Sequence, residues 1–176
     1  MKARPVKKLD PAASLGENAA RIVKVRLGEL LSFVPKALDP DRVEAQHDMR
    51  IAAKRLRYVL EATGFCFGRP AGTARRRARE LQDVLGEIHD CDVMLPRVRA
   101  HLEELQAADA RAVRARAGQT AELDPGLAAR APGRTTYRGL DLLAVHLLAR
   151  RQLLHDRFLA HWRRQEEAGT WARLES

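Results

Sequence analysis

Aromatic residues make up only 5% of this 176-residue chain, and there are just two cysteines, Cys66 and Cys91. Two cysteines exclude a disulfide framework and a CxxC metal knuckle, so we expect both thiols to be reduced. No uninterrupted apolar run reaches the roughly 18 residues that a membrane span needs. The basic start MKARPVKKLDP is followed by no apolar segment typical of a secretory signal. These absences predict a cytoplasmic protein with an aliphatic core.

Strand-like alternation bounded by hairpin turns is also lacking. Apolar residues instead repeat at helical spacing, and an apolar content of 45% argues against a mainly disordered chain. We predict an all-α fold, an antiparallel helical bundle of about four helices in one domain. The bundle is placed at residues 14–168, between a basic N-terminal tail at 1–13 and a C-terminal tail at 169–176.

Capping residues and prolines predict the first two helices. The sequence SLGE is a capping box that begins a helix over about residues 14–34, and Pro35 ends it. Asp39 as an N-cap, with Pro40 at the first helical position, predicts that the second helix begins near residue 40. It should end around Thr63.

The third and fourth helices are predicted from the same kinds of signal. The segment 68–72 is expected to be a connector, after which Thr73 caps the third helix. Pro96 lies inside the apolar repeat of that helix, where it removes one backbone donor and predicts a kink or a break. A long loop at 118–136 then leads to the fourth helix, about Tyr137 to Glu167.

The charge of the chain favours an anionic partner. Lys and Arg total 32 against 23 Asp and Glu, which gives a formal net charge of +9. Such a bias attracts polyanions over a long range, but solvated helix faces also raise the arginine content. Whether these charges form a binding surface or a solvated face therefore has to be inferred from where the basic residues lie in the sequence.

The stretch QHDMRIAAKRLRYVLEATGF, residues 46–65, separates its charges from its apolar residues. At 100° per residue one face holds Met49, Ala52, Ala53, Leu56, Val59, Leu60 and Thr63. The opposite face holds a stripe about 15 Å long that consists of His47, Arg50, Lys54 and Arg57. Like charges at this spacing repel by a few tenths of a kcal/mol per pair, so a merely solvated face would mix in carboxylates. The stripe favours a track for an extended anion, although an amphipathic helix of no special function is the alternative.

Basic residues on the later helices are weaker candidates for widening the track. The third helix is expected to carry four arginines in its first turns, where they oppose the helix dipole and where an anion could use the free amides: Arg75, Arg76, Arg77 and Arg79. Of these, Arg75, Arg76 and Arg79 are the binding candidates. The fourth helix carries three more, the last of them nearer its apolar face: Arg150, Arg157 and Arg151.

Two motifs resemble those of a known family. HDMRIAAKRLRYVLE resembles the H-x-x-R-[IV]-x-x-[RK]-[RK]-L-R signature of the CHAD family, the conserved histidine α-helical domain. LQDVLGEIHDCDVM, residues 81–94, resembles the family's L-G-x-x-[RN]-D-x-x-V segment and follows at a fitting distance. The resemblance covers about residues 40–105.

The resemblance implies an all-helical domain that binds inorganic polyphosphate along a basic surface and associates with polyphosphate granules. Six residues match the two motifs: His47, Arg50, Lys54, Arg55, Arg57 and Asp90. Arg55 lies toward the side of its helix and is expected to reach a neighbouring helix. No cofactor is implied.

The chain departs from the family pattern in two ways. His89 stands where the family commonly has arginine or asparagine, so an anion contact there would depend on pH. Family members usually contain two copies of the helical unit related by pseudo-twofold symmetry, whereas this chain has one. A homodimer could rebuild the two-unit arrangement and double the basic surface.

Two other functions compete with polyphosphate binding. The net charge alone would permit a nucleic-acid-binding protein, but a helix-turn-helix signal, zinc-finger spacing and RNA-motif aromatics are lacking. Three His-Asp dipeptides and Asp92 suggest a metal-dependent phosphohydrolase, yet adjacent residues on a helix point about 100° apart and metal-binding pairs such as His-Glu-x-x-His are lacking. We expect Asp92 to accept a hydrogen bond from a neighbouring arginine instead. No nucleophile arrangement stands out, so we do not expect an enzyme.

Overall fold

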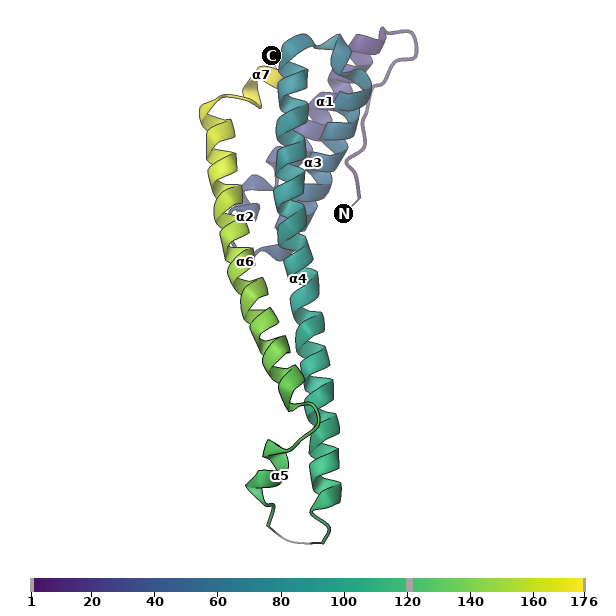
Figure 1. The fold of residues 1–176 in the computed structure, drawn as a ribbon. Coiled ribbons are helices and arrows are strands. Elements are labelled where there is room, and N and C mark those ends of the chain that lie inside the picture. The colour runs from purple at the N-terminus through teal and green to yellow at the C-terminus, as the bar shows by residue number, and fades with distance from the viewer. Residues whose placement is uncertain (1, 120–121, 176) are drawn as a thin grey trace. The chain divides into compact units, whose positions relative to one another are not determined.

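The computed structural model describes residues 2–119 and 122–175, and within these ranges every regular element is a helix (Figure 1). The all-α prediction is confirmed. In chain order the elements are α1 (Leu15–Leu31), α2 (Val34–Ala37), α3 (Val43–Thr63), the 3₁₀ helix η1 (Gly64–Cys66), α4 (Gly68–Arg116), α5 (Pro125–Ala129), α6 (Arg134–Glu167) and α7 (Ala172–Glu175). Met1, residues 120 and 121 of the predicted loop, and Ser176 of the predicted tail lie outside the described residues.

The chain divides into two compact units. The first unit comprises the residues up to His89 together with those from Gln152 onward, and the second comprises Asp90–Arg151. The long helices α4 and α6 each contribute one part to each unit. The first unit therefore contains α1, α2, α3, η1 and α7 in addition to its parts of α4 and α6.

The predicted capping box at the start of α1 is present. The Ser14 hydroxyl accepts a hydrogen bond from the Glu17 backbone N–H, and the Glu17 carboxylate accepts one from the Ser14 backbone N–H. The helix ends at Leu31, three residues earlier than predicted, and Pro35 lies in the first turn of the short α2.

The predicted start of α3 is wrong. Asp39 does not cap the helix, because its Oδ1 accepts a hydrogen bond from the Asp41 backbone N–H in a local turn. The amide of the buried Gln46 side chain donates to the Asp39 carbonyl, 2.9 Å away, and so holds this turn against the helix. The helix begins at Val43, three residues later than predicted, and it ends at Thr63 as predicted.

The predicted connector before α4 is also wrong. Gly68 adopts a left-handed backbone with φ of 65°, which allows a sharp turn at once into the helix. Residues 68–72 and Thr73 are therefore helical, and Thr73 is not an N-cap. Pro96 neither breaks nor ends α4. Because Pro96 is exposed, water can hydrate the carbonyl that loses its helical partner.

The second unit is closed by a buried carboxylate. Asp109 on α4 accepts hydrogen bonds from the Tyr137 hydroxyl and from the Gly133 backbone N–H, the latter at 2.7 Å. Burial, followed by the bond to Asp109, raises the pKa of Tyr137 to about 12. A Cβ atom at residue 133 would lie 2.9 Å from the Asp109 carboxylate, so this close approach requires glycine. These contacts fix the start of α6 after the predicted loop, in which the short α5 was not foreseen.

The end of α6 is fixed in the first unit by a Schellman motif. Gly169, with φ of 59°, donates to the Glu166 carbonyl, and the Thr170 N–H donates to the Gln165 carbonyl. The chain then turns back, so that the ring of Trp171 stacks on that of Trp162 with centroids 6.0 Å apart.

The core of the first unit is mostly aliphatic, but its largest buried side chains are the aromatic Trp162 and Phe158 of α6, so the predicted aliphatic core is only partly correct. On α3 the buried apolar residues are Met49, Ala52, Ala53, Leu56 and Leu60, each at most 2% exposed. These belong to the predicted apolar face, which is thereby confirmed, although Val59 and Thr63 are only half-buried. Both cysteines are free thiols, and burial raises the pKa of Cys91.

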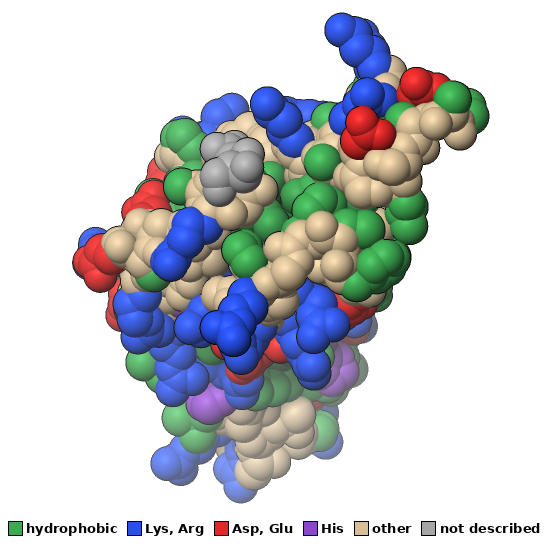
Figure 2. Space-filling model, turned by 90° about the horizontal axis from the view of Figure 1, so that it is seen from above, with side chains coloured by type: hydrophobic (Ala, Val, Ile, Leu, Met, Phe, Trp, Pro, Cys, Tyr) green, Lys and Arg blue, Asp and Glu red, His purple; other side chains and the backbone are tan. Residues whose placement is uncertain are grey.

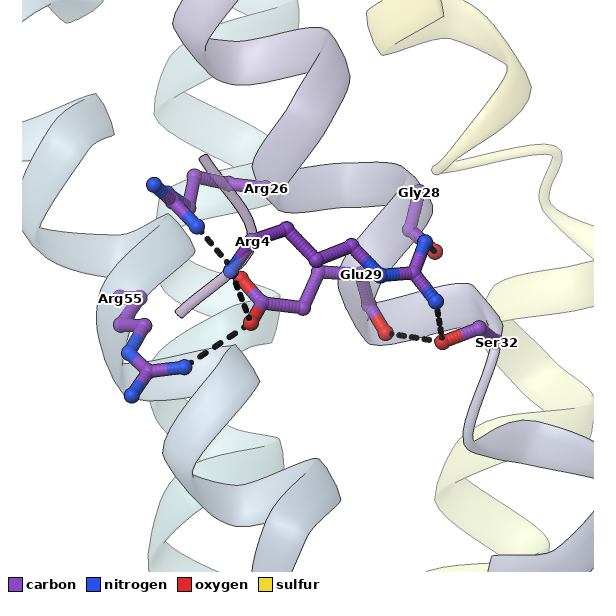
Figure 3. A network of polar contacts seen from close by, with 6 residues as sticks. All are labelled: Arg4, Arg26, Gly28, Glu29, Ser32 and Arg55. Carbon is purple, nitrogen blue, oxygen red and sulfur yellow. Dashed lines mark hydrogen bonds and ion pairs between the residues drawn. The ribbon is translucent and has the colours of Figure 1, made fainter. Parts of the chain in front are cut away.

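A buried carboxylate ties three segments of the first unit together (Figure 3). Glu29 of α1 is 1% exposed and pairs with Arg26 on its own helix at 2.7 Å and with Arg55 of α3 at 2.9 Å. It also accepts a hydrogen bond from the Arg4 backbone N–H, while the Arg4 guanidinium donates to Ser32 and to the Gly28 carbonyl. The N-terminal segment is thus held along α1.

Replacing Glu29 by glutamine should lower the free energy of unfolding by about 3 kcal/mol, because two half-buried guanidiniums would lose their counter-charge. Urea denaturation measures the change. Glu44→Gln, at an exposed position in the first turn of α3, is the control and should change stability by less than about 0.5 kcal/mol. Equal effects of the two substitutions would contradict a structural role for the Glu29 network.

Candidate functional site

The basic stripe predicted on the second helix lies on the side of α3 away from its apolar face. Lys54 is exposed, and His47, Arg50 and Arg57 are half-buried. Three buried nitrogens on this stripe have no hydrogen-bond partner: His47 Nδ1, Arg50 Nε and Arg57 Nε. Polar atoms that are buried in a protein are normally satisfied. The contacts within the folded chain therefore leave these three nitrogens unpaired, while the remaining guanidinium nitrogens of Arg50 and Arg57 and the exposed Lys54 ammonium form the accessible part of the stripe.

Two contacts set the register between α3 and α4, which run in opposite directions (Figure 1). The His47 ring lies against the His89 ring, with centroids 4.6 Å apart and planes at 41°. One turn along, Arg50 Nε lies over Gly86, where a Cβ atom would be 3.5 Å away. In both pairs the residue numbers sum to 136, as a regular antiparallel helix pair requires.

The same register places the rest of the stripe opposite one flank of α4. Lys54 falls opposite Gln82 and Arg57 opposite Arg79. That flank of α4 contains residues 75, 79, 82, 86 and 89, which recur at intervals of four and three. The stripe residues share one face of α3 for the same reason. We call the line along which the stripe and this flank of α4 face each other the groove; it has basic side chains on both helices, with Gln82 and Gly86 between those of α4.

Few carboxylates interrupt this groove. Glu61 lies 3.8 Å from Arg57, and Asp83 lies 3.9 Å from Arg79, both near the limit for an ion pair. Both pairs are at helical i,i+4 spacing and their carboxylates are exposed, so they neutralise the stripe only weakly. In the end-on view of Figure 2, Lys and Arg side chains adjoin one another over part of the surface, in keeping with the net charge of +9.

Arg55 differs from its neighbours on α3. Its guanidinium is bound by the buried Glu29 at 2.9 Å, so it reaches a neighbouring helix as its side position on α3 predicted. The Arg55 side chain stays 25% exposed, so the ion pair holds it in place without removing it from the surface. The structure gives Arg55 a part in packing α1 against α3.

The candidates on α4 lie elsewhere in that helix than predicted. Because α4 begins at Gly68, Arg75, Arg76 and Arg79 lie in its second to fourth turns, where the backbone amides already bond within the helix. The prediction that an anion would use free amides beside them is wrong. All three side chains are exposed, but Arg76 lies around the helix from the flank that Arg75 and Arg79 share.

The candidates on α6 are divided between the two units. Arg157 belongs to the first unit and is exposed. Arg150 and Arg151 belong to the second unit, where Arg150 is exposed and Arg151 forms an ion pair with Asp92. This ion pair confirms the prediction that Asp92 accepts a hydrogen bond from a neighbouring arginine. Asp90, the other carboxylate of the motif, is exposed.

The surroundings of His47 shift its pKa. Its pKa is lowered below the usual histidine range, first by burial and then by the neighbouring His89 and Arg50, while Asp48 opposes the shift. The surroundings of the imidazole therefore disfavour its protonated form in the free protein.

Sequence reasoning missed two residues of the groove. Gly86 makes room for the Arg50 side chain over α4, and the buried Oε1 of Gln82 has no hydrogen-bond partner opposite Lys54. Both lie in the motif LQDVLGEIHDCDVM, but their roles follow only from the pairing of the two helices.

Comparison with protein families gives one match. The family model for the CHAD domain matches residues 2–99, more than half of the chain. The chain belongs to the CHAD family. No curated protein and no solved structure matches it.

The CHAD match covers more than the two sequence motifs. It begins with the N-terminal segment held by Glu29 and includes α1, α3 and the first part of α4. Those are the elements that contain the groove and its support. Among the residues described, no helix has the length and apolarity needed to cross a membrane, and no group of three or more His, Cys, Asp or Glu side chains is suited to hold a metal ion.

The combined substitution Arg50→Gln/Lys54→Gln/Arg57→Gln should leave the unfolding free energy within about 1 kcal/mol of the wild type, because it relieves like-charge repulsion and removes donors that lack partners. Arg55→Gln on the same helix should destabilise by more than this, because Glu29 loses a partner. Urea denaturation of both variants tests the distinction. A large loss in the triple variant would show that the stripe itself stabilises the fold.

Proposed function

We propose that this CHAD protein binds inorganic polyphosphate non-catalytically in the groove between α3 and α4 and that this binding associates it with polyphosphate granules. The observation that carries the proposal is the row of partly or fully exposed basic side chains His47, Arg50, Lys54 and Arg57, aligned on one face of α3. An extended anion satisfies such a row along its whole length, whereas a compact anion would reach only part of it.

The chemistry of the groove suits a phosphate polymer. Arginine offers forked donors to phosphate oxygens, and Lys54 adds an exposed point charge. Tyr58 is exposed, but its ring lies against Arg57 at 4.6 Å, and it is the one aromatic side chain within the stripe. Stacking on successive bases, which single-stranded nucleic-acid binding uses, therefore has little support.

Polyphosphate binding should depend on the stripe rather than on net charge. We expect Arg50→Gln/Lys54→Gln/Arg57→Gln to lose binding to long-chain polyphosphate and to reduce the slope of log affinity against log salt by about 2. The matched control is Arg97→Gln/Arg99→Gln/Arg111→Gln, three exposed positions on α4. Both variants change the net charge from +9 to +6, since each removes three positive charges. The control should bind nearly as well as the wild type.

The titration should include duplex DNA and RNA at matched phosphate concentration and two salt concentrations. Binding that favours polyphosphate and is lost only in the stripe variant supports the proposal. Equal affinity for every polyanion, with equal losses in both variants, would leave a generic basic surface. A lack of polyphosphate binding by the wild type at physiological salt would refute the proposal.

The pairing of two copies, which the family resemblance implies, stays a prediction. Light scattering coupled to gel filtration at micromolar concentration should give twice the chain mass of 19.7 kDa. A single-chain mass, with or without added polyphosphate, would count against a homodimer.

A further inference from the structure

The end of the groove at His47 has a chemistry that the rest lacks. Here two imidazoles from different helices are in contact, His47 from α3 and His89 from α4, with ring centroids 4.6 Å apart. Beside them, the buried Nε of Arg50 has no hydrogen-bond partner, and neither does the buried Nδ1 of His47. Two unsatisfied nitrogens therefore lie within one helical turn of each other.

The side chains of His47 and Arg50 indicate the class of group that suits this end of the groove. Arg50 Nε is always a donor, so its partner must be an acceptor. A neutral imidazole donates at only one nitrogen, whereas a protonated imidazole donates at both. An oxyanion satisfies Arg50 and favours the protonated form of the ring beside it. A phosphate group meets both conditions, and a cation meets neither.

Without a bound anion, the two imidazoles and the Arg50 guanidinium disfavour a further positive charge at this end of the groove. The side chains that act on His47 are His89 from α4 and Arg50 and Asp48 from α3, and together with burial they lower its pKa in the free protein. A phosphate group in contact with the ring acts in the opposite direction and raises that pKa. The two states of the site thus differ in their affinity for a proton.

We propose that one phosphate group of the bound polymer docks against His47, His89 and Arg50, and that its docking is coupled to the uptake of one proton by His47. The inference rests on the proposed function, because the polymer is the source of the phosphate group. It makes the groove a pH-responsive binding site, which tightens as the medium becomes more acidic.

The sign of the effect follows from linkage. In the free protein, protonation of His47 favours the unfolded chain because the folded pKa is the lower one, so stability decreases as pH falls through the histidine range. In the complex the proton is bound with the ligand. The dissociation constant should therefore decrease as pH falls, by at most about tenfold per pH unit, the limit for one proton.

The test is a titration of the full chain with long-chain polyphosphate between about pH 8 and about pH 5.5, the interval around the ordinary histidine pKa. The internal groups of a long polymer are strong acids, so they do not titrate in this interval. Calorimetry at a fixed pH near 7, repeated in buffers of different ionisation enthalpy, counts the protons taken up by the wild type and requires no variant.

His47→Asn/His89→Asn should bind polyphosphate with an affinity that no longer increases at low pH, and its proton count should fall to near zero. His101→Asn is the control, since His101 is exposed on α4 and lies 3.6 Å from Glu104. It should keep the wild-type pH dependence. Circular dichroism at each pH verifies that every protein is folded.

The outcomes separate the two proposals. Proton uptake by the wild type that disappears in the double variant supports the inference. Binding with the same pH dependence in wild type and double variant would overturn it while leaving polyphosphate binding intact. A lack of binding at every pH would refute the proposed function itself, and the inference with it.

Discussion

The burial of the apolar face of α3 is the interaction on which the rest of this structure depends. Met49, Leu56 and Leu60 are fully buried or nearly so, and each contributes about 1.5–3 kcal/mol relative to an exposed side chain. Repulsion among the basic residues of the opposite face costs only a few tenths of a kcal/mol per pair. The packing free energy therefore easily exceeds the electrostatic cost, and a strongly cationic row can be held in a fixed position.

The contacts that α1 makes with α3 are as important as the burial of the apolar face of α3. Glu29 lies at the junction of α1, α3 and the N-terminal segment, and it supplies the counter-charge of Arg55. Two arginines only two residues apart on one helix, Arg55 and Arg57, thus have different environments. The Arg55 guanidinium is bound by a buried carboxylate, whereas Arg57 has the exposed Glu61 at 3.8 Å. A residue on another helix thus sets the difference between the two.

Periodicity predicted the parts of the site that lie within one helix. The apolar and basic faces of α3 follow from the angle per residue alone, so the sequence was sufficient for them. The partners across the groove depend on register, which no local pattern contains, and so Gly86 and Gln82 were overlooked. Glu29 was missed because a single glutamate in an amphipathic helix resembles a surface residue. The start of α4 was misplaced because Gly68 and Pro70, which usually indicate a connector, here begin the helix directly.

The regular spacing of donors along the groove has a statistical consequence for any uniform polymer. Successive positions recur at intervals of three and four residues, about 5 Å apart along the helix axis, and none of them distinguishes one repeating unit from the next. A bound homopolymer can therefore shift by one unit and find equivalent contacts. The number of such alignments grows with the number of units, so longer polymers gain a favourable entropy of placement without any additional contact.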